Sequence, residues 1–343
     1  MNEQVCTRCL MDTTCTDIDF DDNGVCSFCR AYERYIREHK DSDKFTQEIF
    51  DETIAAIKKD GEDKEYDCVA GVSGGVDSSY IALRASQLGL RVLCIHVDNG
   101  WDTVIANKNI ERLVKRLDFT LHTDVLDWEE FKDIQRSFFK ASVVDIELIT
   151  DQALFACIFR ECRKHDLHYV LGGYNPTCEA SCFMPRGWNH EKLDVLNIFA
   201  IQNRFGEKRI DNYPILDPYT YRQVRFHQGL QMFNILEFED FNHAETIELL
   251  KSELGWEEYG GKHCESMFTK YYQHHILPTK FNVDKRKVFY SNMIMAGEMT
   301  RDKAIEKLNA SHYSERDLRR DTAYIIKKLG FTKEEFEEIM NAP

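Results

Sequence analysis

The sequence lacks the features that would place it in several common classes of protein. It has no uninterrupted apolar run of about 18 residues, the minimum for a membrane-spanning helix. Its start, MNEQVCTRC, contains no apolar secretion signal, so we expect a cytoplasmic protein that makes no membrane association. It also lacks basic charge, because 44 Lys and Arg stand against 59 Asp and Glu, a formal net charge of −15. This balance favours a small-molecule or protein partner and disfavours nucleic acid.

Internal repeats and low-complexity segments are also absent. Hydrophobic residues make up 43% and charged residues 30% of the 343 residues, which is ordinary for a globular protein with one large domain or two. Structural disulfides are rare in the cytoplasm. The 12 cysteines are therefore expected to be metal ligands, redox groups or small buried side chains.

Four of the cysteines form two C-x-x-C pairs near the N-terminus. Cys6 and Cys9 form the first pair, and Cys26 and Cys29 follow after sixteen residues. This spacing fits a tetrahedral site of four thiolates, for which zinc is the expected ion. So short a segment cannot build an apolar core, so the metal would supply its stability. An iron–sulfur cluster and a redox C-x-x-C are the alternatives, and Cys15 lies outside the spacing.

The strongest pattern in the chain is a strand, a glycine-rich turn, a helix and a second strand. An apolar run from Tyr66 to Val72 ends at the turn Ser73-Gly74-Gly75. Asp77 to Leu88 has the spacing of an amphipathic helix, and Arg91 to Val97 is a buried-strand run. Such a turn aims backbone N–H groups and a helix N-terminus at one point, and its glycines let a phosphate approach closely. The alternative is a tight turn with a good helix cap.

Strands and helices then alternate along the chain. Helices are expected at 102–117, 128–139 and 148–165, and strands at 120–125 and 168–171. This alternation predicts an α/β fold, a parallel sheet with helices on both faces. Ligands of such sheets lie beyond the carboxyl ends of the strands. Three loops should meet there, at 73–78, 97–101 and 172–182.

The remaining segments are less informative. We expect one or two surface helices over 31–60, an extended stretch with little helix at 213–218, and mostly helix from Asn242 onward, with capping boxes at Asn242 and Thr332. The third loop holds Cys178 and Cys182, which are either chemically active or inert and buried. It also holds the polar residues Glu179 and Arg186, which could face a substrate.

The segment SGGVDS resembles the signature of the PP-loop ATP pyrophosphatase superfamily; it is neither a Walker A loop nor a dinucleotide-binding GxGxxG. The resemblance implies that ATP is cleaved between the α- and β-phosphates and that AMP is placed on the substrate. The residues implied to hold the β- and γ-phosphates are Ser73, Gly74, Gly75, Asp77 and Ser78. Those implied to border the rest of the nucleotide are His96, Val97, Asp98, Gly172 and Gly173. A simple turn at Asp98-Asn99-Gly100 is the alternative there.

Residues 263–308 resemble the C-terminal signature of N-acetyl sugar amidotransferases of lipopolysaccharide and pseudaminic-acid biosynthesis. Together with the C-x-x-C pairs and the PP-loop, the resemblance covers most of the chain. It implies four parts: a zinc knuckle over 1–30, linking helices over 31–60, an ATP-binding domain over 61–240 and a helical region over 241–343. Three departures concern the substrate more than the reaction. Tyr174 replaces the glutamate that precedes Asn-Pro in relatives, a C-x-x-x-C is present, and Cys264 separates His263 from Glu265.

The implied reaction converts an acetamido group on a sugar to an acetamidino group. Adenylation of the amide oxygen makes AMP the leaving group, and ammonia then attacks the carbon. Asp77 and Ser78 are the implied catalytic residues; Asp77 would contact Mg²⁺ or else cap the helix. The chain lacks the cysteine of a glutaminase, because position 2 is Asn and no G-x-C-x-G is present. A glutaminase partner of the histidine-biosynthesis type is therefore implied.

A short polar segment at 280–286 is a candidate for binding the sugar. Lys285 and Arg286 could match its phosphate or carboxylate, although a solvated helix start explains them as well. Two competing functions have the same loop. In a tRNA-thiolating enzyme Cys178 and Cys182 would carry sulfur or hold a cluster, and a regulatory module would bind ATP without chemistry.

Overall fold

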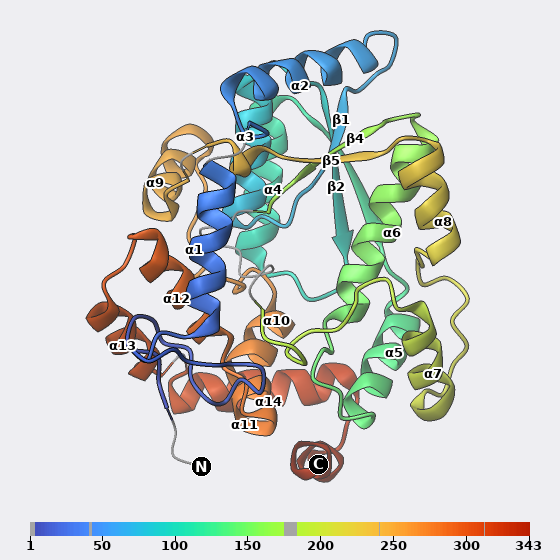
Figure 1. Ribbon diagram of the computed structural model, residues 1–343. Coiled ribbons are helices and arrows are strands. Elements are labelled where there is room, and N and C mark those ends of the chain that lie inside the picture. The colour runs from blue at the N-terminus through green and yellow to red at the C-terminus, as the bar shows by residue number, and fades with distance from the viewer. Residues whose placement is uncertain (1–3, 41–42, 175–183, 240, 312) are drawn as a thin grey trace.

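The computed structural model describes residues 4–40, 43–174, 184–239, 241–311 and 313–343. Its centre is a parallel sheet with the strand order β3-β2-β1-β4-β5 (Figure 1). The strands are β1 (Cys68–Gly71), β2 (Val92–Asp98), β3 (Thr120–Val125), β4 (Tyr169–Gly172) and β5 (Gln231–Asn234). Because every pairing is parallel, the carboxyl ends of all five strands lie at one edge of the sheet, where a ligand is expected.

Helices cover both faces of the sheet, as the sequence predicted. The side chains of β1 alternate: Cys68 and Ala70 belong to a core with the helices of one face, and Val69 belongs to a core with the helix of the other. The first face carries α2 (Gln47–Asp60), α3 (Val76–Gln87), α4 (Val104–Leu117) and α9 (His243–Leu254); the second carries α6 (Leu148–Lys164). Figure 1 shows α3, α4 and α9 on one side of the sheet and α6 on the other.

A second, largely helical body lies beyond the carboxyl end of the sheet (Figure 1). Its core is aromatic. Phe139 of α5 packs edge-on against Phe268 and Phe331, and it packs at a tilt against Phe336. The helices concerned are α5 (Trp128–Lys140), α10 (Met267–Tyr271), α11 (Leu277–Phe281), α12 (Lys285–Ala296), α13 (Arg301–Asn309), α14 (Glu315–Leu329) and α15 (Lys333–Asn341). A π-helical turn, Tyr272–Ile276, joins α10 to α11.

The helical body is tied to the sheet by backbone hydrogen bonds at the end of β2. Thr103 N donates to Glu265 O at 2.8 Å, and Met267 N donates to Trp101 O at 2.8 Å. Asp102 and Ser266 form an antiparallel bridge between these two bonds. The segment that leads into α10 is therefore held beside the loop that follows β2.

The two helices expected over 31–60 are present as α1 (Ser27–Lys40) and α2. The helix expected from 102 begins at Val104 instead, because the side chain of Thr103 caps it by accepting a hydrogen bond from Ala106 N at 3.2 Å. The capping box at Thr332 is confirmed in both directions. None of the helices in the described ranges combines the length and apolar character needed to cross a bilayer.

The extended stretch with little helix predicted at 213–218 is confirmed up to Asp217. The residues around it contain elements that the sequence did not predict: among the described residues of 190–240 these are α7 (Val195–Phe205), α8 (Pro218–Arg222), the π-helical turn Gln223–His227, the strand β5 and the 3₁₀ turn Ile235–Glu237. Local capping makes both α-helices: the side chain of Asp194 accepts from Asn197 N, and that of Asp217 accepts from Tyr219 N and Thr220 N. The strand was missed because its four residues show no alternation in burial.

Candidate nucleotide site and cysteine cluster

The turn between β1 and α3 has the geometry of an anion cradle. Gly74 adopts a φ of +75°, and Gly75 is the last residue before α3. Gly75 N donates to Ser73 Oγ at 3.2 Å, and the Ser73 and Ser78 hydroxyl oxygens lie 3.2 Å apart. The first N–H groups of an α-helix have no intrahelical acceptor, so those of α3 can face an anion. The loop thus fits the phosphate-binding role that its sequence predicts.

Gly74 is also required by packing, which the sequence did not show. A Cβ atom at this position would lie 2.4 Å from Ala106 O in α4. The Gly74 carbonyl accepts hydrogen bonds from Trp256 Nε1 at 3.0 Å and Asn109 Nδ2 at 3.3 Å. The loop is therefore clamped between α4 and the segment that follows α9.

Asp77 lies in the first turn of α3 and is not the N-cap residue of this helix. The N-cap residue is Gly75, which offers no side chain for capping. The Asp77 carboxylate pairs instead with Lys262, at 3.6 Å between Oδ2 and Nζ. Lys262 also lies over the Phe289 ring, 4.7 Å from its centroid. A cation from the C-terminal half of the chain thus lies beside the phosphate loop.

The loops predicted to meet do line one cavity of about 1170 Å³. The predicted nucleotide neighbours that line it are Ser73, Ser78, His96, Val97, Gly172 and Gly173. Asp98 is not among the lining residues; its Oδ1 accepts a hydrogen bond from Gly100 N at 2.8 Å, which is the simple turn considered as the alternative.

His96 is held on both sides of its ring. Nδ1 lies 3.0 Å from Val72 O, and Nε2 lies 3.1 Å from Asp102 Oδ2. Burial lowers the pKa of His96, but the hydrogen bonds to Asp102 and to the Val72 carbonyl outweigh it, so the net effect is a raised pKa. The His96 ring therefore links the residue after β1 to the loop after β2 at the edge of the cavity.

The far wall of the cavity comes from the helical body and carries positive charge. Its cationic lining residues are Lys285, Arg286, Lys303 and Lys307. Arg286 is already engaged, because its guanidinium forms two hydrogen bonds with Asp284, at 2.9 and 2.7 Å, and one with Ala310 O at 3.1 Å. Lys285 is the freer of the two predicted substrate residues.

Arg186, the predicted substrate residue near the third loop that the structure describes, does not join this lining. It is exposed and uses its backbone N–H to bond Asp17. Glu179, Cys178 and Cys182 lie outside the described residues. Lys192, just beyond this loop, lines the cavity and pairs with Asp145 at 2.6 Å and Asp151 at 3.0 Å.

Glu265 is the site residue that sequence reasoning missed. Its carboxyl faces the phosphate loop: a Cβ atom added to Gly75 would lie 3.9 Å from Glu265 Cδ. Its Oε2 is shielded from solvent and makes no hydrogen bond with the part of the chain that the structure describes. Burial raises the pKa of Glu265 to about 7; Glu147 and Asp77 add to this effect and Lys262 opposes it. No periodicity marks the residue, because it lies in an irregular segment between α9 and α10.

The raised pKa of Glu265 predicts a pH-dependent effect of Glu265→Gln on stability. Between its ordinary pKa of 4.5 and about 7 the native state binds more protons than the unfolded state, so stability falls as pH rises through this window. The neutral glutamine removes that loss. The free energy of unfolding in urea is measured for both proteins at pH 4.5 and pH 8, and the wild-type value is subtracted from the variant value at each pH. We expect this difference to be more favourable to the variant at pH 8 than at pH 4.5, by on the order of 1–3 kcal/mol. Equal differences at both pH values would contradict the prediction.

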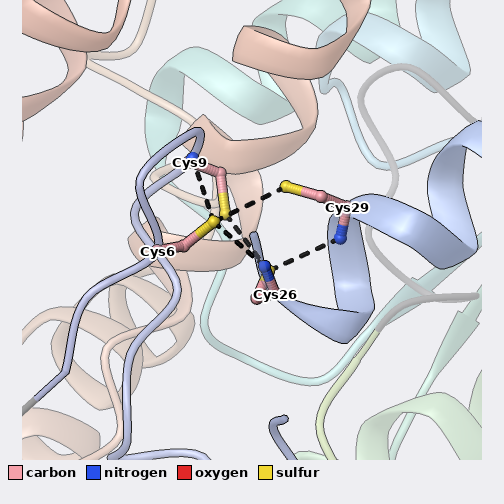
Figure 2. Close-up of side chains that lie close together, drawn as sticks. All are labelled: Cys6, Cys9, Cys26 and Cys29. Carbon is pink, nitrogen blue, oxygen red and sulfur yellow. Dashed lines mark hydrogen bonds between the residues drawn. The ribbon is translucent and has the colours of Figure 1, made fainter. Parts of the chain in front are cut away.

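The four N-terminal cysteines point their sulfur atoms toward one another (Figure 2). All four thiols are buried, and all four sulfurs lie within 4.8 Å of each other. Cys9 and Cys26 Sγ are 3.6 Å apart, and Cys6 and Cys29 Sγ are 3.9 Å apart. The edge of a tetrahedron of thiolates around one zinc ion is about 3.8 Å for a metal–sulfur bond of about 2.3 Å. The geometry fits one metal ion, whereas a multi-iron cluster would separate the sulfurs further.

Backbone N–H groups point at these sulfurs, as expected around thiolate ligands. Cys6 Sγ accepts from Cys9 N at 3.4 Å and from Cys26 N at 3.3 Å. Cys9 Sγ accepts from Met11 N at 3.4 Å. Hydrogen bonds from the neighbouring cysteines hold the pKa of Cys6 well below its usual range. Cys15 is buried but does not belong to the cluster.

Comparison with known proteins gives one family match. Residues 265–343 match the family described as LPS biosynthesis protein WbpG-like, C-terminal domain. The matched range begins at Glu265 and contains α10 to α15, which supply the basic wall of the cavity. The resemblance expected for the C-terminal region is confirmed at this level; the description names a biosynthetic context and no reaction. No curated protein sequence matches the chain.

The solved structures that this chain matches include two synthetases and a tRNA thiolase. The NH₃-dependent NAD synthetase of Campylobacter jejuni is 15% identical, covers 61% of this chain and 93% of its own, and has a TM-score of 0.32. The NMN synthetase of Francisella tularensis is 14% identical, covers 61% of this chain and 94% of its own, and has a TM-score of 0.29. The U34-tRNA thiolase NcsA of Methanococcus maripaludis, solved with its [4Fe–4S] cluster, is 12% identical. It covers 87% of this chain and 90% of its own, and its TM-score is 0.32. Similarity at this level does not define an activity.

Proposed function

We propose that this chain is an ATP-dependent, AMP- and pyrophosphate-forming amidotransferase that converts an acetamido group on a sugar to an acetamidino group. The observation that carries the proposal is the shared cavity. Ser73 and Ser78 of the SGGVDS loop line this cavity, and so do residues of the segment that matches the WbpG-like C-terminal domain. Such an enzyme would act in the cytoplasm in the synthesis of bacterial surface glycans.

ATP fits the loop side of the cavity. The loop N–H groups and the two serine hydroxyls would hold its β- and γ-phosphates, and Lys262 would neutralise part of their charge. Mg²⁺ would stabilise the negative charge of the leaving pyrophosphate. Asp77 would be its protein ligand, because the residue lies in the first turn of α3 beside the loop.

The sugar fits the helical side. Lys285, Lys303 and Lys307 could bind the phosphates of a nucleotide-linked sugar or the carboxylate of a nonulosonic acid. The amide oxygen would then point at the α-phosphate across the cavity, so positioning supplies much of the rate. Ammonia would come from a glutaminase partner. The four cysteines would hold one zinc ion with a structural role.

The test is product analysis with a panel of acetamido sugars. UDP-N-acetylglucosamine, its uronic acid and N-acetylneuraminic acid are each incubated with the protein, MgATP and ammonium chloride. We expect AMP and pyrophosphate in equal amounts with at least one of them, and a product one mass unit lighter than the sugar because NH replaces O. ADP and phosphate would show that the loop is wrongly assigned. AMP formation that requires tRNA would favour the thiolating enzyme.

A further inference from the structure

Glu265 has surroundings that suit a proton acceptor and that no structural role explains. The backbone carbonyl of Glu265 accepts a hydrogen bond from Thr103 N, which fixes the residue beside the phosphate loop. The carboxyl lines the cavity, and the buried Oε2 lacks a hydrogen-bond partner among the described residues. A buried carboxylate oxygen is normally paired, because an unpaired one loses its hydrogen bonds to water without replacement. An unpaired one at the nucleotide site points to a polar partner that comes with the substrates.

The charged and titratable groups around this carboxyl come from three parts of the chain. Asp77 of α3 and Glu147, the residue before α6, add negative charge. Lys262 and Tyr259, from the segment after α9, supply the cation and a phenol. Gln273 Nε2 donates to Glu147 Oε2 at 3.1 Å, so Glu147 is partnered and Glu265 is not. Of the two glutamates, Glu265 alone presents an unused oxygen beside the loop where AMP would be transferred.

We propose that Glu265 is the general base of the amide-to-amidine step; this rests on the proposed function. Neutral ammonia attacks the carbon of the adenylated, N-protonated imidate, and a C–N bond forms. The C–O bond to AMP breaks, and its electron pair leaves on the phosphate oxygen. The nitrogen that attacked sheds one proton, which Glu265 Oε2 accepts. Charge balances: a carboxylate, a neutral imidate adenylate and ammonia become a carboxylic acid, an amidinium and the AMP dianion.

The competing role for Glu265 is a ligand of the Mg²⁺ that accompanies ATP. Mg²⁺ requires near-octahedral oxygen ligands and fully ionised carboxylates. The buried carboxyl, with its pKa raised to about 7, suits general acid–base catalysis near neutral pH. The two roles differ in timing, because a metal ligand acts in the adenylation step and the proposed base acts only after it.

The test separates the two steps with Glu265→Gln. Isotope exchange between pyrophosphate and ATP, in the presence of the active panel sugar and without ammonium, reports adenylation alone. Amidine formation with saturating ammonium chloride reports both steps. We expect exchange within about threefold of wild type and a kcat for amidine formation lower by about 10²–10⁴-fold. The wild-type kcat should fall as pH drops below about 7, where Glu265 becomes protonated, and the variant should lack this dependence.

The matched control is Glu257→Gln, in the same segment but exposed and paired with Arg112 on the surface. It should change neither reaction. If the glutamine variant is insoluble, Glu265→Asp carries the test: it should retain exchange and the pH dependence with a reduced kcat. Loss of exchange, or unchanged amidine formation, would overturn the role of Glu265 while the proposed function stands. Absence of exchange in the wild type with every sugar would overturn the proposed function itself.

Discussion

Removing the metal from the cysteine cluster is expected to unfold the first thirty residues and release zinc. The change is Cys9→Ser, which takes one of four buried thiols from a site whose sulfurs lie within 4.8 Å of each other. Metal binding of this type contributes about 10–16 kcal/mol in isolated zinc-finger peptides, and the segment has little core of its own to replace it. Mass spectrometry under native conditions should show the loss of one zinc ion, and hydrogen exchange over 5–30 should become fast.

Cys15→Ser is the matched control, because Cys15 is equally buried in the same segment and lies outside the cluster. It should keep the zinc and the slow exchange. Zinc retained by Cys9→Ser, or lost from Cys15→Ser, would contradict the four-cysteine assignment. If the purified protein contains iron and is brown, the four cysteines hold an iron–sulfur cluster instead of zinc.

Loss of the metal should also affect the cavity, because the N-terminal cysteine segment is hydrogen-bonded to the C-terminal helices. Leu10 N donates to Ser291 Oγ of α12 at 3.1 Å. The Arg301 guanidinium donates to Cys9 O at 3.3 Å and to Cys6 O at 3.2 Å. Since α12 and α13 carry the lysines of the cavity wall, we expect faster exchange in both helices and a weaker affinity for the sugar. The metal would thus support binding without contacting the substrate.

The features that could be predicted from the sequence are those set by neighbouring residues. The strand before Ser73, the turn and α3 follow each other directly, so their apolar spacing and glycines identified the loop. The two C-x-x-C pairs likewise show their geometry in their spacing. The rule for parallel sheets then placed three loops at one edge, and the cavity lies there.

The features that were missed depend on residues far apart in the chain. Lys262 contacts Asp77, and Glu265 faces Gly75, only because the segment after α9 returns to the end of β2. No local sequence pattern predicts that the segment after α9 packs against the end of β2. Arg286 shows the opposite case: its guanidinium is held by Asp284, two residues earlier, which is the helix-start explanation that the sequence had left open.

Gly74→Ala is expected to abolish AMP formation. It should also destabilise the fold more than an alanine substitution does at a glycine that has a positive φ but no close neighbours. A φ of +75° costs alanine about 1–2 kcal/mol. The added Cβ would also lie 2.4 Å from Ala106 O, a backbone atom that cannot rotate away. Overpacking of this kind costs about 1–3 kcal/mol more, and the loop must move from its position against α4 to relieve it.

Gly229→Ala provides the control for the conformational part alone. Gly229 has a φ of +74°, nearly the same as Gly74, and nothing lies within 4 Å of a Cβ added there. The difference between the two free energies of unfolding, measured in urea, therefore isolates the overlap with α4. We expect Gly74→Ala to lose at least about 1 kcal/mol more than Gly229→Ala, and only Gly74→Ala to lose nucleotide cleavage. Equal destabilisation would show that α4 yields, and AMP formation at the wild-type rate in Gly74→Ala would show that the phosphates are held elsewhere.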